Sequence, residues 1–144
     1  MNNVASVDIA LLDVSSVEML ENVADDLFDQ TLQPELIEEF LTDPRHHLAM
    51  ATLDDQVIGF ASAVHYVHPD KPTELWINEV GVADAYQGQG IGKRLMKTLF
   101  SLGEQLGCAE AWVLADQDNH RARGFYESLG GDASPAVMYT FKTQ

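Results

Sequence analysis

A glycine-rich turn between a strand-like and a helix-like segment constrains this chain more than any other feature. Residues 87–92 read Gln-Gly-Gln-Gly-Ile-Gly, after an apolar run over residues 75–83 and before a helical pattern over residues 93–106. Backbone N–H groups at such a helix start have no intrahelical partners, and the helix dipole adds about half a positive charge there. Gly90 and Gly92 keep Cβ atoms away from an approaching phosphate. The turn therefore predicts an anion-binding site.

The spacing of this turn is Gln-x-x-Gly-x-Gly. It is neither the dinucleotide fingerprint G-x-G-x-x-G nor the nucleotide P-loop G-x-x-x-x-G-K-[ST]. At 144 residues the chain has the length of one domain, so we expect a single domain over residues 1–144.

Hydrophobic periodicity predicts the order strand, two helices, three strands, helix, strand, helix, strand. The expected strands cover residues 7–12, 47–53, 57–66, 73–83, 109–115 and 137–141. The expected helices cover residues 15–27, 34–42, 93–106 and 119–129, the first capped by Ser15-Ser16. Asp54-Asp55-Gln56 is a hairpin signal between the second and third strands. The order indicates an α+β fold with helices on both faces of one sheet.

Charge and composition limit the partners and the compartment. The formal net charge of -15 excludes ordinary binding to a nucleic-acid backbone and makes an anionic membrane an unsuitable partner. No apolar run is long enough to span a membrane, and the N-terminal stretch MNNVASVDIALLD lacks the positive charge of a secretory signal. The single cysteine, Cys108, excludes an internal disulfide, and nothing in the sequence points away from a reducing cytoplasm. Cys108 itself is expected to be buried and inert.

The charges are distributed unevenly along the chain. Residues 1–44 contain no Lys or Arg, whereas basic residues including Lys93, Arg94 and Lys97 follow the glycine turn. This asymmetry suggests two ligands of opposite charge. The alternative is a solvated acidic surface that keeps the protein soluble, as in a salty habitat.

At this point the residues resemble the GNAT-type N-acetyltransferases, which bind acetyl-CoA through the pattern Gln/Arg-x-x-Gly-x-Gly/Ala. Gln87, Gly90 and Gly92 fill its three positions. Residues 119–130 are similar to the family's Asn-x-x-Ala-x-x-Phe-Tyr-x-x-x-Gly helix, although Gly131 stands where the family usually has an aromatic residue. The resemblance implies a single mixed, mostly antiparallel sheet flanked by helices, and a homodimer.

A narrower resemblance is to the aminoglycoside 3-N-acetyltransferases of the gentamicin-resistance type. Residues 77–92, Ala115-Asp116 and Val137-Met138 carry it, and that subgroup also has acidic residues where Glu79 and Asp116 stand. Its helix lacks the asparagine found here at Asn119. The resemblance implies a small polycationic acceptor such as an aminoglycoside, with polyamines or a peptide amine as alternatives.

Acetyl transfer to an amine needs a neutral amine, a polarised thioester carbonyl and a proton for the leaving thiolate. Glu79 precedes Gly81, and a glycine within a strand often marks a bulge or a close backbone approach. There the pantetheine arm could lie along the strand while Glu79 takes the proton of the ammonium group, directly or through water. The alternative for Glu79 is a solvated or ion-paired strand carboxylate.

By the resemblance, Tyr126 is the general acid that protonates the sulfur of CoA. Its alternative is an ordinary helix aromatic packed on the sheet. A further alternative is a protein that binds acetyl-CoA without catalysis, but the presence of both Glu79 and Tyr126 argues against it.

No metal is expected. His65 and His68 lie three residues apart on a strand, so they face opposite sides and cannot chelate one ion together.

The candidate binding residues fall into two groups. The cofactor-binding candidates are Val80, Gly81, Val82, Gln87, Gly88, Gln89, Gly90, Ile91, Gly92, Lys93, Asn119, Ala122 and Tyr126. The acceptor-binding candidates are Asp25, Asp26, Asp29, Glu79 and Asp116.

Overall fold

The computed structural model describes residues 6–144, and their contacts form two compact units, Met1–Leu114 and Ala115–Gln144. Residues 1–5, which belong to the stretch considered for a secretory signal, lie outside the described residues. The single domain over residues 1–144 stays a prediction. Among residues 6–144, none of the helices combines the length and the apolar character that crossing a membrane would take.

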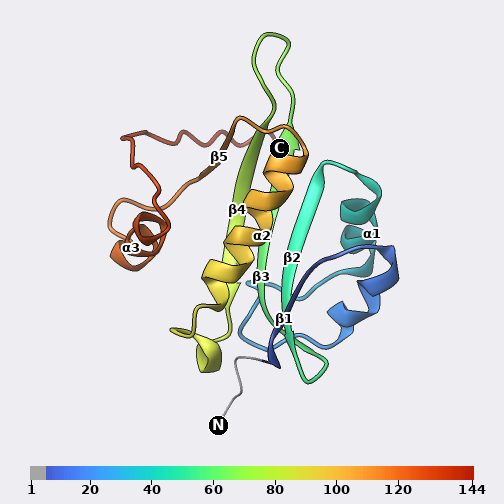
Figure 1. Ribbon diagram of the computed structural model, residues 1–144. Coiled ribbons are helices and arrows are strands. Elements are labelled where there is room, and N and C mark those ends of the chain that lie inside the picture. Colours follow the sequence, from blue (N-terminus) through green and yellow to red (C-terminus); the bar gives the residue numbers. More distant parts are fainter. Residues whose placement is uncertain (1–5) are drawn as a thin grey trace. The chain divides into compact units, whose positions relative to one another are not determined.

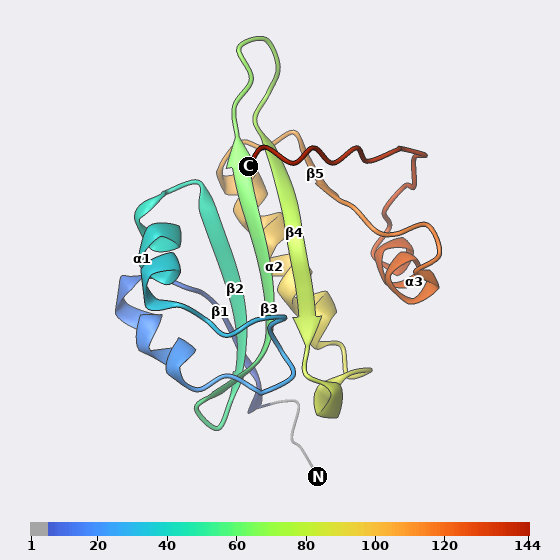
Figure 2. The same ribbon diagram turned by 180° about the vertical axis from the view of Figure 1, so that it is seen from behind.

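The first unit is built on one five-stranded sheet in the order β1-β2-β3-β4-β5 (Figures 1 and 2). The strands are β1 (Asp8–Leu11), β2 (His46–Leu53), β3 (Gln56–Tyr66), β4 (Glu74–Val82) and β5 (Glu110–Val113). Neighbouring strands from β1 to β4 are antiparallel, and β5 runs parallel to β4. The mixed, mostly antiparallel sheet that the family resemblance implies is confirmed.

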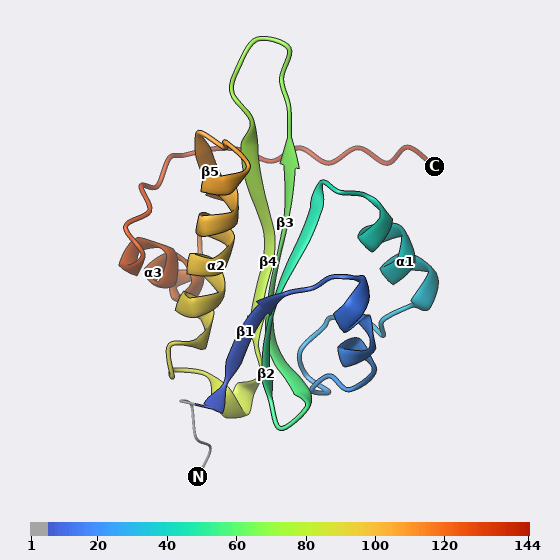
Figure 3. The same ribbon diagram turned by 45° about the vertical axis from the view of Figure 1, so that its right-hand side comes forward.

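Helices cover both faces of this sheet, as Figure 3 shows with α2 on one side and α1 on the other. The first face is covered by α2 (Ile91–Gln105), whose apolar stripe includes the fully buried Ile91, Leu95 and Leu99. A Cβ at Gly59 on β3 would lie 3.3 Å from Ile91 and from Leu95, so the helix packs directly on the sheet.

The second face is covered by the 3₁₀ helix η2 (Val14–Glu21), by α1 (Pro34–Thr42) and by the segment between them. Phe28 from this segment stacks on Phe60 of β3, with ring centroids 4.2 Å apart. Pro34 occupies the first turn of α1, as expected. The buried residues of this core are Leu20, Ala24, Leu27, Leu48, Met50, Val57, Phe60 and Ala83.

The hairpin between β2 and β3 is confirmed. Asp54 and Asp55 adopt φ values of 49° and 64°, as a tight turn matching the twist of the two strands requires.

The first helix differs from its prediction. It is capped by Asp13, whose Oδ1 accepts hydrogen bonds from the N–H groups of Ser15 and Ser16, and it ends at Glu21. Beyond it, Val23 forms a bridge with Val57 on β3. Pairing with a distant strand therefore replaces the helical turns that the apolar spacing predicted up to residue 27.

The second unit contains α3 (His120–Ser128), in agreement with the helix expected there. The closing strand expected over residues 137–141 is wrong, because residues 131–144 carry no regular secondary structure. A strand needs a neighbouring strand for its backbone hydrogen bonds, and the apolar alternation alone does not supply one. The side chains of Val137, Met138, Tyr139 and Phe141 remain 73–80% exposed.

Candidate active site

A bulge in β4 directs Glu79 to the face of the sheet that η2 and α1 cover. The register between β3 and β4 shifts between Ser62 and Ala63, which leaves Asn78 as an extra residue without an opposite partner. Because side chains alternate between the two faces, a regular strand would place Glu79 on the same face as the buried Ile77. With the extra residue, Glu79 is exposed and lies opposite Ser62.

Gly81 marks a close approach rather than the bulge. It pairs regularly with Phe60, and a Cβ at this position would lie 3.1 Å from the Phe60 Cε1 atom. The same Cβ would lie 3.5 Å from the carbonyl oxygen of Leu27. Glycine is therefore required for the packing of the Phe60 ring beside the bulge.

Glu79 and Ser62 line a groove of about 370 Å³, called here the inner groove. Its remaining polar lining is Asp29, Gln30, Thr31 and Gln33. Its apolar lining is Leu12, Leu20, Phe28, Leu32, Leu36, Ile37, Phe40, Leu48 and Phe60. Among the described residues that line it, none is Lys, Arg or His, so the groove combines carboxylates with apolar walls.

A second groove, called here the outer groove, adjoins the inner one and shares with it the lining residues Leu20, Phe28, Asp29, Gln30, Thr31, Leu32 and Ile37. Its volume is about 1280 Å³. Its lining carboxylates are Glu18, Glu21, Asp25, Asp29 and Glu38. Here too, no described lining residue is basic, so the field in both grooves favours a cation.

The aspartates predicted to bind the acceptor are not gathered at one point. Asp29 lines both grooves, and Asp25 lines only the outer one. The Asp26 carboxylate instead accepts a hydrogen bond of 2.8 Å from the backbone N–H of Asp84, so it fixes the chain that follows β4. Asp116 belongs to the second unit, where it is exposed.

The glycine turn has the backbone geometry that an anion cradle needs. Gly88 and Gly90 adopt φ values of 76° and 81°, which L-residues rarely adopt, and no other group lies within 4 Å of a Cβ built on either. Gly90 is the N-cap of α2, and no side chain caps this helix start. The first α2 hydrogen bond that involves the cap runs from the Arg94 N–H to the Gly90 carbonyl oxygen. The preceding N–H groups of Ile91, Gly92 and Lys93 are therefore the donors that such a helix start offers to an anion.

Side chains around the turn have mixed roles. The Gln87 side-chain amide donates to the Val82 carbonyl oxygen at 2.9 Å and to Asp84 Oδ1 at 3.1 Å, so it braces the turn against the end of β4. Lys93 is exposed in the first turn of α2. Arg94, another basic residue that follows the turn, donates to the carbonyl oxygen of Val7 at 2.8 Å.

One edge of β4 is open beside this turn. The parallel pairing with β5 covers only Glu74–Ile77 of β4, whereas Val80, Gly81 and Val82 are paired with β3 alone among the described residues. An extended chain carrying amide groups could therefore add to this edge, as the sequence predicted for the pantetheine arm.

The second unit holds the remaining candidates on α3. Asn119 caps the helix, because its Oδ1 accepts a hydrogen bond of 3.1 Å from the Ala122 N–H. Burial raises the pKa of Tyr126, which keeps its hydroxyl protonated. Gly130 and Gly131 donate to the carbonyl oxygens of Glu127 and Tyr126 and end the helix. A Cβ at Gly131 would lie 3.0 Å from the Tyr126 carbonyl oxygen, so a larger residue there would require a local shift of the backbone.

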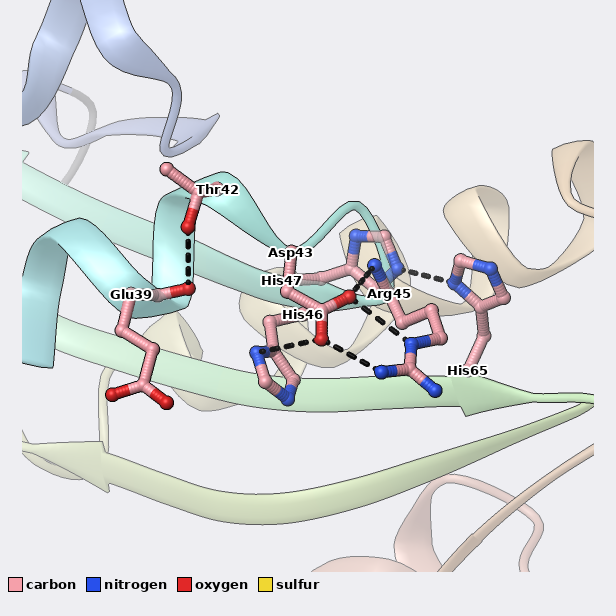
Figure 4. A network of polar contacts seen from close by, with 7 residues as sticks. All are labelled: Glu39, Thr42, Asp43, Arg45, His46, His47 and His65. Atoms are coloured by element: carbon pink, nitrogen blue, oxygen red, sulfur yellow. Dashed lines mark hydrogen bonds and ion pairs between the residues drawn. The ribbon is translucent and has the colours of Figure 1, made fainter.

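Figure 4 shows a polar network between α1 and β2 that the sequence did not reveal. Asp43 accepts hydrogen bonds from the Arg45 Nε and Nη2 atoms at 3.1 Å and 2.9 Å, which hold the pKa of its carboxyl well below the ordinary value. His47 Nε2 lies 2.7 Å from His65 Nδ1. Burial, with smaller contributions from the charges of His65 and His46, lowers the pKa of His47 to about 4. The His47 ring is therefore neutral at physiological pH.

His65 and His68 have separate partners, and His68 lies beyond the end of β3 rather than on the same strand as His65, as the sequence analysis had it. The His68 Nε2 atom lies 2.6 Å from Glu74 Oε2, whereas His65 contacts His47. Within residues 6–144, no three His, Cys, Asp or Glu side chains are grouped so that they could hold a metal ion. Burial raises the pKa of the Cys108 thiol, which lowers its reactivity.

This chain is similar in sequence to a known protein family and to individual proteins. A sequence model described as the acetyltransferase (GNAT) family matches residues 14–131. An uncharacterized N-acetyltransferase of Mycobacterium tuberculosis is 28% identical over 102 residues, which are 71% of this chain and 63% of that protein. The chain thus spans less than two thirds of the length of this relative.

Two solved structures share the fold. An aminoglycoside acetyltransferase from an uncultured soil metagenomic sample, in complex with trehalose, has a TM-score of 0.80 and 20% identity, with 98% of each chain covered. The aminoglycoside acetyltransferase AAC(6')-Iy, in complex with a bisubstrate analogue of CoA and acetylneamine, has a TM-score of 0.80 and 21% identity. That comparison covers 96% of this chain and 99% of the other. At such identities the likeness shows the fold alone.

Proposed function

This chain belongs to the acetyltransferase (GNAT) family, and we propose that it transfers the acetyl group of acetyl-CoA to a small cationic amine. The observation that carries the proposal is the position of Glu79. The bulge at Asn78 turns this carboxylate into a groove whose described lining has no basic residue. A carboxylate in such a groove can attract an ammonium group and then accept its proton.

The glycine turn and the open edge of β4 fit acetyl-CoA as the second substrate. Positive φ values at Gly88 and Gly90 and an uncapped α2 N-terminus suit a pyrophosphate. The edge at Val80, Gly81 and Val82 suits the amide groups of the pantetheine arm. Of the predicted residues, Gln87 then holds the turn in shape, and Lys93 adds a positive charge beside it.

In the proposed reaction Glu79 takes a proton from the ammonium group, directly or through water. The amine nitrogen then forms a bond to the thioester carbonyl carbon and the carbon–sulfur bond breaks. The nitrogen releases its second proton to water as the amide forms, and a proton from water restores the acid that protonates the sulfur. By the family resemblance Tyr126 gives its hydroxyl proton to the departing sulfur. Burial raises the pKa of Tyr126, so the hydroxyl carries its proton before the transfer, and the same shift makes it a weaker acid toward the sulfur.

Aminoglycosides, at the 3-amino group, are one candidate class of acceptor within this proposal. The carboxylates of the outer groove support a polycation, and two proteins of similar fold are aminoglycoside acetyltransferases. Polyamines and the α-amine of a peptide are the other candidates.

A panel of these amines with acetyl-CoA tests the proposal. Release of the CoA thiol is followed together with the mass of the acetylated product. We expect amine-dependent thiol release with at least one class. Tight acetyl-CoA binding with no amine turnover across the panel would instead favour a protein that binds acetyl-CoA without catalysis.

We also propose that the chain acts as a cytoplasmic homodimer. The exposed apolar side chains between Val137 and Phe141 support the dimer, because such a segment gains stability by pairing with another surface. Light scattering after gel filtration should give twice the mass of 15.9 kDa. The monomer mass at micromolar concentration would refute the dimer.

A further inference from the structure

We propose that the inner groove selects amines whose nitrogen is carried by an apolar alkyl or aryl segment. This inference rests on the proposed function and narrows its acceptor. Amines whose neighbouring atoms are hydroxylated, aminoglycosides among them, are then poor acceptors. The inference is based on the lining of this groove, which is charged around Glu79 and apolar elsewhere.

The charged part of the groove suits one ammonium group. Glu79 and Asp29 are its charged residues among those described, and both are acidic. Ser62 lies opposite Glu79 and is the other polar side chain contributed by the sheet. An ammonium group beside Glu79 can donate hydrogen bonds to the carboxylate and to a hydroxyl such as that of Ser62.

The rest of the groove suits the apolar part of the same molecule. Phe60, which is 4% exposed, lies two residues before Ser62 on β3, and its ring stacks on Phe28. Leu48 is 7% exposed and forms another part of the sheet surface there. From α1, Leu36 lines the groove while 56% of its surface is exposed. Phe60 and Leu48 are already buried, so the area that a hydrocarbon chain removes from water lies on Leu36 and on the half-buried Phe28 and Ile37, and on the chain itself.

A hydroxylated amine would bind the groove more weakly than an apolar amine. Hydroxyl or ether oxygens placed against Phe28, Phe60 and Leu48 would lose their water without finding a hydrogen-bond partner. Unsatisfied polar groups of this kind weaken binding strongly. The rim residues Gln30, Thr31 and Gln33 are exposed and can serve only atoms at the mouth of the groove.

Two amines with the same number of non-hydrogen atoms test the inference: hexylamine and 2-(2-aminoethoxy)ethanol. Initial rates with acetyl-CoA are expressed per total amine concentration at neutral pH, where both amines are ammonium ions, the form that Glu79 is proposed to bind. We expect kcat/KM to be roughly tenfold or more higher for hexylamine, because one methylene and the terminal methyl of hexylamine are oxygens in the ether alcohol. Equal values, or a preference for the ether alcohol or for an aminoglycoside, would overturn the inference.

Leu36→Gln tests the groove wall without disturbing the core, because Leu36 is largely exposed in a helix that tolerates Gln. We expect kcat/KM for hexylamine to fall about fivefold and that for the ether alcohol to stay unchanged. Val67→Gln is the matched control, since Val67 is 77% exposed in the β3–β4 connection and lines neither groove. Equal losses for both amines in Leu36→Gln would contradict the assignment of this wall.

Calorimetric binding of the two amines separates this inference from the proposed function. If no amine is acetylated, the proposed function fails. Tighter binding of hexylamine, weakened by Leu36→Gln and not by Val67→Gln, would still support the groove. Equal binding of the two amines would overturn the inference regardless of turnover.

Discussion

Replacing Gly90 by Ala tests the glycine turn through its backbone alone. Gly90 has φ of 81°, and a Cβ built on it meets no atom within 4 Å. The substitution therefore introduces no clash, and its whole cost is the unfavourable left-handed conformation. For an L-residue this cost is about 1–2 kcal/mol.

The strain should appear in the affinity for acetyl-CoA. The free variant can relieve it by rotating the backbone at the start of α2, but binding of the pyrophosphate then has to restore the strained turn. We expect the KM for acetyl-CoA to rise about five- to thirtyfold while the KM for the amine stays unchanged. If the free variant keeps the strained turn, it should instead lose about 1–2 kcal/mol of unfolding free energy.

Steady-state kinetics with each substrate varied in turn, together with urea unfolding, measures both quantities. Gly90→Asn should show a smaller effect, because Asn adopts this conformation more readily. Gly124→Ala is the control: this helical glycine has open space and no positive φ, so Ala should stabilise the protein by about 0.5–1 kcal/mol. If Gly90→Ala changes neither acetyl-CoA affinity nor stability, the cradle argument is wrong.

Three further substitutions test the rest of the structure. Gly81→Ala should lower the unfolding free energy by about 1–2 kcal/mol in urea unfolding, because the added Cβ would lie 3.1 Å from Phe60 Cε1. It should also raise the amine KM, because Phe60 lines the inner groove. An unchanged amine KM would show that the packing of Phe60 does not affect amine binding. His47 keeps its full contribution to stability above the unfolded pKa of about 6.5, and this contribution falls as the pH drops toward the folded pKa of about 4. Between pH 7.5 and pH 4 the unfolding free energy of the native protein should therefore fall by about 1–2 kcal/mol more than that of His47→Gln. This range allows for solvent screening of the half-buried ring. Equal decreases in the two proteins would refute the prediction. Tyr126→Phe should lower kcat about tenfold or more without changing unfolding free energy by more than about 1 kcal/mol, whereas full activity would leave Tyr126 a packing role.

Local sequence signals predicted the elements whose structure depends on nearby residues. The turn at Asp54-Asp55, the proline start of α1 and the apolar stripe of α2 each rest on residues within a few positions of one another. The glycine turn belongs to the same group, since positive φ values and a helix start are local properties.

Features that depend on pairing between distant segments were not predictable in this way. The end of the first helix is set by the bridge between Val23 and Val57, and the direction of Glu79 is set by an extra residue, Asn78, against β3. Asp26 resembled its acidic neighbours in the sequence, yet it binds the backbone of Asp84. The sequence therefore indicated which residue types form the site, whereas the fold decides which of them face the groove.

The pH dependence of acetyl transfer by Glu79→Gln tests the central proposal most directly, with Asp25→Asn as a control that removes a carboxylate only from the outer groove. If Glu79 deprotonates the ammonium group, kcat of Glu79→Gln at neutral pH should fall about 10- to 100-fold. The deficit should shrink as the pH approaches the pKa of the amine, since the acceptor then arrives neutral. Asp25→Asn should change kcat less than about twofold. A Glu79→Gln rate equal to that of the native protein, or a deficit that stays constant at every pH, would contradict the role of Glu79 as the base.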